Sequence, residues 1–265
     1  MSPDNVPVSG AMLMRMPAIR GLIDRRILVN YRVDPDVLRR ICPAPFRPQV
    51  VNGFGVAGIC LIRLKHIRPK RLPAFLGISS ENAAHRIAVE WVADGMIQRG
   101  VYIPRRDTSS LLNALAGGRI FPGIHHHAKF DVREKDGRYR VSMTSRDGNA
   151  HVSVDGVTAS ELPDGSIFPD VAACSRFFED GSVGYSPAKP NGRFDGLELR
   201  TVNWNVQPLA ISRLTSSFFD RRDHFPAGSA VFDSAMLMRG IHHEWHSRES
   251  VCCSVEPAGL RAHAL

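Results

Sequence analysis

Two Asp-Gly pairs, Asp136-Gly137 and Asp147-Gly148, separate three short segments that are rich in β-branched and aromatic residues. Asp-Gly is favoured in two-residue hairpin turns, because both central residues of such a turn adopt positive φ angles. The flanking segments, 128–133, 139–145 and 151–157, are therefore predicted to form an antiparallel meander.

The rest of the chain contains more strand signals than helix signals. Strands are predicted at 26–33, 53–67, 86–92, 101–103, 197–206 and 230–246. Short helices are predicted at 35–41 after the N-cap Asp34, at 109–116 between Thr108 and Gly117-Gly118, and at 171–179 before Gly181, with a loop at 185–196. Many short strands and few helices predict a mainly β fold, a closed antiparallel β barrel that can enclose one small ligand.

The 265 residues, 43% of them hydrophobic and 23% charged, are enough for one folded β domain. We expect a loose lead-in at 1–20, a barrel domain at 21–250 and a flexible tail at 251–265. The five cysteines include no CxxC pair, which favours reduced thiols. Arg15, Pro17 and Arg20 interrupt the only apolar stretch near the N-terminus, so neither a signal sequence nor a membrane span is expected, and the cytoplasm is the predicted compartment.

The net charge of +8 is carried mostly by arginine, since the sequence contains 29 arginines and five lysines. Arginine presents a planar fork of donors that suits carboxylate and phosphate, so a small anionic or carbonyl-containing ligand is expected. A GC-rich genome would produce the same bias without a ligand. The basic residues are scattered and no nucleic-acid-reading motif accompanies them, so neither nucleic acid nor a membrane is a predicted partner, whereas a homo-oligomer remains open.

Two histidine clusters are candidate sites. On a strand, His125 and His127 share one face and His126 points to the other. The segment His242-His243-Glu244-Trp245-His246 places a second set of ligand-type side chains on one face. The spacing is not that of a helical HExxH zinc motif, and histidines that are hydrogen-bonded or exposed are the favoured interpretation. No metal or cofactor is predicted.

The strand 86–92 and the segment after it supply further candidates. Glu90 lies among apolar residues, where a carboxylate serves either as a general acid or base or as an ion-pair partner of Arg105 or Arg106. Arg105-Arg106-Asp107-Thr108, at a predicted helix start, forms either an anion-binding corner or a network of caps and ion pairs. Tyr102 is expected to lie in the core or the wall of a binding pocket.

Four segments resemble the acetoacetate decarboxylase superfamily, and three of them resemble its uncharacterised branch, domain of unknown function 2071. They are Val29-Asn-Tyr-Arg-Val-Asp-Pro-Asp-Val-Leu-Arg39, Gly100-Val-Tyr-Ile-Pro-Arg-Arg-Asp-Thr108, Gly117-Gly-Arg-Ile-Phe-Pro-Gly123 and Met238-Arg-Gly-Ile-His-His-Glu-Trp-His246. The resemblance covers about residues 24–248 and implies a cone-shaped β barrel with an internal pocket for a small acid or ketone.

The resemblance also carries a departure from the decarboxylases. In that family a pocket lysine, one of a pair that follows Tyr-Pro, forms a Schiff base with a β-keto acid. The nearest counterpart here is Phe121-Pro122, followed by Gly123 and Ile124, so both lysine positions are vacant. Lys129 can take the role only if the strand register differs. The family's arginine near the first strand corresponds to Arg25 or Arg26.

Three functional hypotheses follow. The first is a lyase- or isomerase-like enzyme that acts on a small carboxylate or carbonyl compound by acid/base chemistry. In it Glu90 and either His125 or His127 carry protons, and Arg26 or Arg106 holds the anion. The second is a non-catalytic protein that binds a small molecule inside the barrel. The third is Schiff-base catalysis through Lys129.

Overall fold

The computed structural model describes residues 18–115, 123–188 and 192–252. Its strands form one 13-stranded sheet, so the predicted mainly β fold is confirmed. The strands are β1 (Ile19–Val33), β2 (Arg47–Pro48), β3 (Val50–Val51), β4 (Phe54–Pro69), β5 (Ile78–Ala93), β6 (Met96–Thr108), β7 (His125–Lys135), β8 (Arg138–Ser145), β9 (His151–Thr158), β10 (Val183–Ala188), β11 (Arg193–Thr201), β12 (Gln207–Ser216) and β13 (Ala230–Cys252). The helices are α1 (Pro35–Ile41), α2 (Leu111–Leu115), α3 (Val171–Asp180) and the 3₁₀ turn η1 (Ala74–Leu76). None of these helices is long and apolar enough to cross a membrane.

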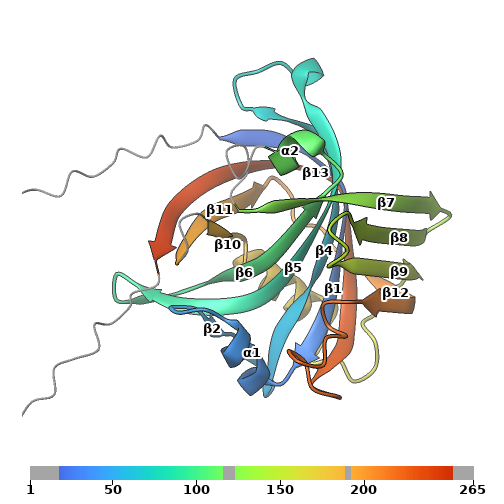
Figure 1. The fold of residues 1–265 in the computed structure, drawn as a ribbon. Coiled ribbons are helices and arrows are strands. Elements are labelled where there is room, and N and C mark those ends of the chain that lie inside the picture. The colour runs from blue at the N-terminus through green and yellow to red at the C-terminus, as the bar shows by residue number, and fades with distance from the viewer. Residues whose placement is uncertain (1–17, 116–122, 189–191, 253–265) are drawn as a thin grey trace, which may run out of the picture.

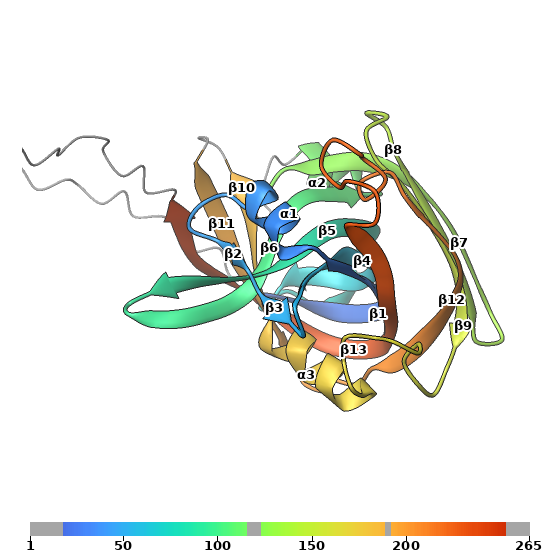
Figure 2. The ribbon, with the colours of Figure 1, turned by 90° about the horizontal axis from the view of Figure 1, so that it is seen from below.

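The strand pairings close into two rings that share five strands, in the order β13-β1-β4-β5-β6. In one ring, β7, β8, β9 and β12 complete the circuit; in the other, β10 and β11 do so. Figures 1 and 2 show these two sets of strands on opposite sides of the shared strands. The pairing is antiparallel except at β6–β7 and β6–β10, which are parallel.

Both Asp-Gly pairs lie between paired strands, but only Asp136-Gly137 forms the predicted two-residue turn, since Asp147-Gly148 lies in a longer loop between β8 and β9 and only Gly148 has a positive φ angle. Asp136 and Gly137 have φ angles of 49° and 74°, as a two-residue hairpin turn requires. The strands β7, β8 and β9 pair in sequence order, which confirms the predicted meander. Helix α1 also begins as predicted, because the Asp34 side chain accepts a hydrogen bond of 2.8 Å from the Asp36 amide.

The shared strands carry a hydrophobic core on each face, because successive side chains of a strand point to opposite sides. On one face, Val29 and Ile59 pack with residues of β8, β9 and β12 and with the aromatic ring of Phe46. On the other face, Leu28 and Ile62 pack against α3, β11 and β13. The second face borders the candidate site described below.

Three sequence predictions differ from the structure. The segment 185–196, predicted as a loop, contains the end of β10 and the start of β11, because residues 183–188 pair with 193–198 and bury Tyr185 and Phe194. The strand predicted at 197–206 ends at Thr201. The strand β12 was not predicted, since Pro208 and a mixed polar pattern obscure its alternation. Gly117, Gly118, Phe121, Pro122 and Cys253 lie outside the described residues.

Candidate functional site

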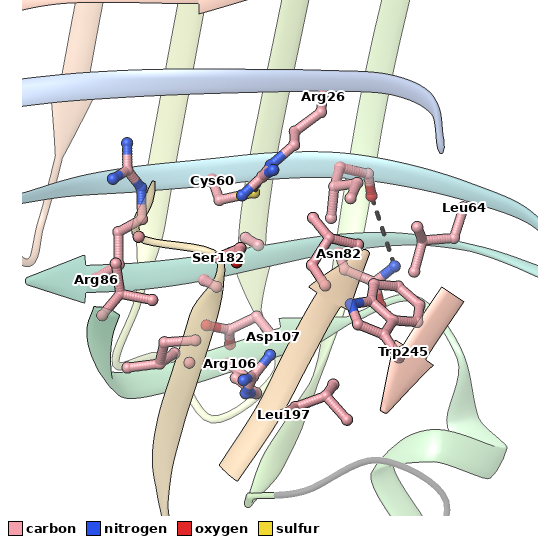
Figure 3. A pocket seen from close by; sticks show the side chains of 18 of the residues that line it. Arg26, Cys60, Leu64, Asn82, Arg86, Arg106, Asp107, Ser182, Leu197 and Trp245 are labelled. Carbon is pink, nitrogen blue, oxygen red and sulfur yellow. Dashed lines mark hydrogen bonds between the residues drawn. The ribbon is translucent and has the colours of Figure 1, made fainter. Parts of the chain in front are cut away.

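A cavity of about 140 Å³ lies inside the ring that β10 and β11 complete. All seven strands of that ring contribute lining residues, and Phe178 of α3 and His125 of β7 join them. Three lining residues are arginines, Arg26 of β1, Arg86 of β5 and Arg106 of β6, so we call it the arginine cavity. Figure 3 shows these side chains and their strands.

The Arg26 guanidinium contacts two sulfur atoms and an aromatic ring. Its Nε donates to the Cys60 Sγ at 3.3 Å, and its Nη1 lies 3.9 Å from the Met238 Sδ. The guanidinium carbon lies 5.7 Å from the centre of the Trp204 ring. Sulfur is a weak acceptor, so these contacts orient the cation and leave its charge uncompensated.

Arg86 is almost fully buried, with 4% of its surface exposed. Its Nη2 donates to the Asn30 Oδ1, and the guanidinium carbon lies 4.5 Å from the centre of the Phe178 ring. Among the described residues, the buried Nε has no hydrogen-bond partner. Burial lowers the pKa of Arg86 to about 10, and the nearby charge of Arg26 contributes to the same shift. A buried cation with an unsatisfied donor is the kind of group that an anionic ligand stabilises.

Arg106 and His125 are neighbours because β6 and β7 pair in parallel with these two residues in register. The Arg106 Nε donates to the Ser186 Oγ at 2.9 Å, and burial lowers the pKa of Arg106 to about 10. Burial, together with the charge of Arg106, lowers the pKa of His125 to about 4. The imidazole is therefore neutral near pH 7 and lies beside a cation inside the cavity.

The only acidic residue among the described lining residues is Asp107, and its charge is already compensated. Arg105, which points to the other face of β6, forms an ion pair with Asp107 and a second one with Asp147. Within the described residues, no carboxylate lies within ion-pair distance of Arg26, Arg86 or Arg106. The cavity thus combines apolar walls with three unpaired cations.

The other predicted site residues lie outside the cavity lining. Tyr102 is buried in the opposite core, where its ring lies 5.8 Å from that of Phe46. Glu90 lies near the end of β5, across from Arg47 and Arg99, and Arg105 forms its ion pairs with Asp107 and Asp147 instead of Glu90.

His127 and Lys129, the other two candidates on β7, do not line the cavity with His125. His127 does not line the cavity, because β7 leaves β6 after three paired residues and continues into the other ring. Lys129 is exposed on the same strand. His126, predicted to point the other way from His125, forms an ion-pair contact of 2.9 Å with Asp147.

The second histidine cluster, residues 242–246, borders a different groove. His242 and Glu244 line a groove together with Arg20, Arg68 and Arg200, and Glu244 contacts Lys70 and His246. In the described part of the chain, no group of three or more His, Cys, Asp or Glu side chains has the arrangement of a metal site.

Arg86, the most buried of the three arginines, was missed by sequence reasoning. Its strand was predicted, but the candidate residue predicted on that strand was Glu90, four residues further along. An arginine in the run Arg86-Ile-Ala-Val-Glu-Trp-Val92 was a usable signal, because a cation on an otherwise apolar strand requires a partner or a ligand.

Comparisons with known proteins agree with this architecture. The model of the family DUF2071, described as an uncharacterized conserved protein, matches residues 23–227. No curated protein matches the chain in sequence.

Solved structures with the same fold include acetoacetate decarboxylase from Legionella pneumophila, with a TM-score of 0.57 and 12% identity over 94% of this chain and 99% of that one. The enduracididine biosynthesis enzyme MppR complexed with pyruvate has a TM-score of 0.55 and 14% identity, with 93% of each chain covered. MppR with bound HEPES buffer has a TM-score of 0.56 and 12% identity, covering 92% of this chain and 90% of that one. At these identities the likeness concerns the fold alone.

Proposed function

This chain belongs to the DUF2071 family and has an acetoacetate decarboxylase-like fold, and we propose that it binds a small organic acid in the arginine cavity. The observation that carries the proposal is the set of three arginines that line one cavity without a carboxylate partner among the described residues. Unpaired cations in a partly desolvated site are stabilised by an anion that replaces water.

The size of the cavity favours a short acid. Its volume of about 140 Å³ is well below the roughly 300 Å³ at which pockets for drug-sized ligands begin. A structural neighbour, MppR, has been solved with pyruvate. Pyruvate and acetoacetate, which are short carbonyl acids, are therefore the first ligands to test.

Proton transfer by His125 is the chemistry that fits this cavity best. Its imidazole is neutral near pH 7, so it can accept a proton from the carbon next to a carbonyl group. Arg106, its neighbour, is placed to hold the carboxylate and to stabilise the negative charge that develops on the carbonyl oxygen. This is an acid/base reaction of the lyase or isomerase type.

We further propose that the reaction needs no Schiff-base lysine. Lys65 and Lys70 are ion-paired with Asp24 and Glu244, and Lys129 and Lys135 are exposed. None of these four lysines lines the cavity.

Titration calorimetry with pyruvate and acetoacetate tests binding. Arg106→Gln should weaken the affinity about tenfold or more, because it removes a charge-assisted hydrogen bond. Arg99→Gln is the matched control, since Arg99 is exposed on the same strand and does not line the cavity. Equal affinities of the two variants would contradict the proposal.

Exchange of the C3 protons of pyruvate with solvent deuterium, followed by proton NMR, tests the acid/base step. We expect exchange above the buffer rate, its loss in His125→Gln and its retention in His127→Gln, which changes a histidine of the same strand outside the lining. Tight binding with no exchange would instead identify a non-catalytic binding protein.

A further inference from the structure

We infer that the acid bound in the arginine cavity carries two carboxylates, one at each end of a short chain. This inference rests on the proposed function and adds to it the charge of the ligand. It starts from the number and the position of the cations that line the cavity.

A single carboxylate cannot balance the three cations of the cavity. Arg26, Arg86 and Arg106 have no acidic partner among the described residues, and Arg105 already neutralises Asp107. One carboxylate leaves two cations without a counter-charge, and a second carboxylate leaves one. Because burying a charge without a partner is costly, the dianion is the better complement.

Two of the cations come from opposite sides of the cavity. Arg26, on β1, donates a hydrogen bond to Cys60 of β4, and the strands β4 and β5 separate β1 from β6. Arg106 lies on the opposite side, beside His125 and Ser186 on β6 and its neighbours. Figure 3 shows Arg26 next to Cys60 on the β1 and β4 side, and Arg106 on the β6 side of the cavity.

This separation distinguishes a dicarboxylate from a phosphoryl group. A phosphate or phosphonate concentrates its charge on one atom group, so its best site brings donors together at one point. Here apolar side chains such as Leu197, Ile62 and Val101 belong to the wall of the same cavity. Apolar walls with a cation at each end suit a short carbon chain with a carboxylate at each end.

The arrangement also assigns the roles of the two ends. The carboxylate at Arg106 lies next to His125, where the proton transfer is proposed, and the other carboxylate, at Arg26, lies away from it. Arg26 therefore determines specificity for the far carboxylate, while Arg106 is needed for any acid.

The test compares succinate with succinamate by titration calorimetry, because the two have the same shape and differ by one negative charge. The unaltered protein should bind succinate about tenfold or more tightly than succinamate. Arg26→Gln should lower the affinity for succinate by a larger factor than the affinity for pyruvate and so abolish this preference, and Arg26→Lys should restore part of it. The comparison in the unaltered protein decides the question even if a variant fails to fold.

The possible outcomes separate the two proposals. If pyruvate binds but succinate and succinamate bind equally, the dicarboxylate inference is wrong and the binding of a small acid stands. If methylphosphonate binds more tightly than succinate, the cations serve one phosphoryl group and the inference is likewise overturned. If none of these acids binds, the proposed function itself fails.

Discussion

Arg105 donates two hydrogen bonds to Asp107, one from Nε and one from Nη2, and each is 2.9 Å long. Asp107 is completely buried, so Arg105 compensates a carboxylate that is shielded from water. Because Arg105 and Asp107 are two residues apart on β6, their side chains share the face opposite to Arg106, and the negative charge of Asp107 does not offset that cation.

Replacing Arg105 with Gln should destabilise the fold by about 3 to 5 kcal/mol, because it leaves the buried Asp107 carboxylate without its cation. Chemical denaturation measures this loss. The matched variant Arg99→Gln, on the exposed part of β6, should change stability by less than about 0.5 kcal/mol. A similar small effect in both variants would mean that the Arg105–Asp107 pair contributes little.

Binding of an acid should be accompanied by proton uptake at His125. The pKa of His125 is lowered to about 4 by burial and by the charge of Arg106. A carboxylate bound to Arg106 offsets that charge and raises the pKa, so affinity should increase as the pH falls from 7 to 5. Calorimetry in buffers with different ionisation enthalpies counts the protons, and His125→Gln should take up none.

A Schiff base should not form on Lys129. Treatment with pyruvate and borohydride should leave the intact mass of the protein unchanged, because Lys129 is exposed and its amine lies outside the cavity lining. An increase that maps to Lys129, and that disappears in Lys129→Arg, would restore the Schiff-base hypothesis.

Stability should decrease as the pH falls below about 6.5, partly because of His85. This residue is fully buried, its ring lies 4.6 Å from that of Phe218, and neither ring nitrogen has a hydrogen-bond partner in the part of the chain that the structure describes. Burial lowers its pKa from 6.5 to about 4, so between these values the unfolded chain binds the proton and the folded chain does not. The stability contributed by neutral His85 is present above pH 6.5 and is lost as the pH falls towards 4.

The magnitude of that loss is on the order of 3 kcal/mol, from about 1.4 kcal/mol for each unit of pKa difference. Urea denaturation between pH 4.5 and 7.5 measures it. The variant His85→Phe should flatten this part of the profile, whereas His242→Gln, which changes an exposed histidine, should leave it unchanged.

The local elements of the fold were predictable because neighbouring residues determine them. Asp136-Gly137 encodes a turn through its own φ angles, and Asp34 caps α1 through its own side chain. The closure of two rings was not predictable, since it depends on β6 and β13, each of which pairs with strands on both sides and with members of both rings. The strand β10 was missed for the same reason, because Pro and Gly residues around it suggest a loop until β6 and β11 pair with it.

The candidate site was predictable in kind and only partly in its residues. Arg26, Arg106 and His125 line one cavity, and their roles there remain predictions. Glu90 was proposed because a carboxylate on an apolar strand is conspicuous, but the distance along β5 separates it from the cavity that Arg86 reaches. The alternation of side chains predicts which face of a strand a residue occupies. Without the register of the strands it does not predict whether the residue lies level with the cavity.

The two rings with five strands in common impose a constraint on the divergence of this chain. On each shared strand, alternate positions face one of two interiors, the hydrophobic core around Val29 and Ile59 and the core that borders the arginine cavity. A lineage can therefore exchange residues at the positions that face the cavity and acquire a new specificity, while the residues that face the other core preserve thermal stability. An inserted or deleted residue within β1, β4 or β5 would exchange both interiors at once, so we expect length changes to accumulate in the connecting turns instead.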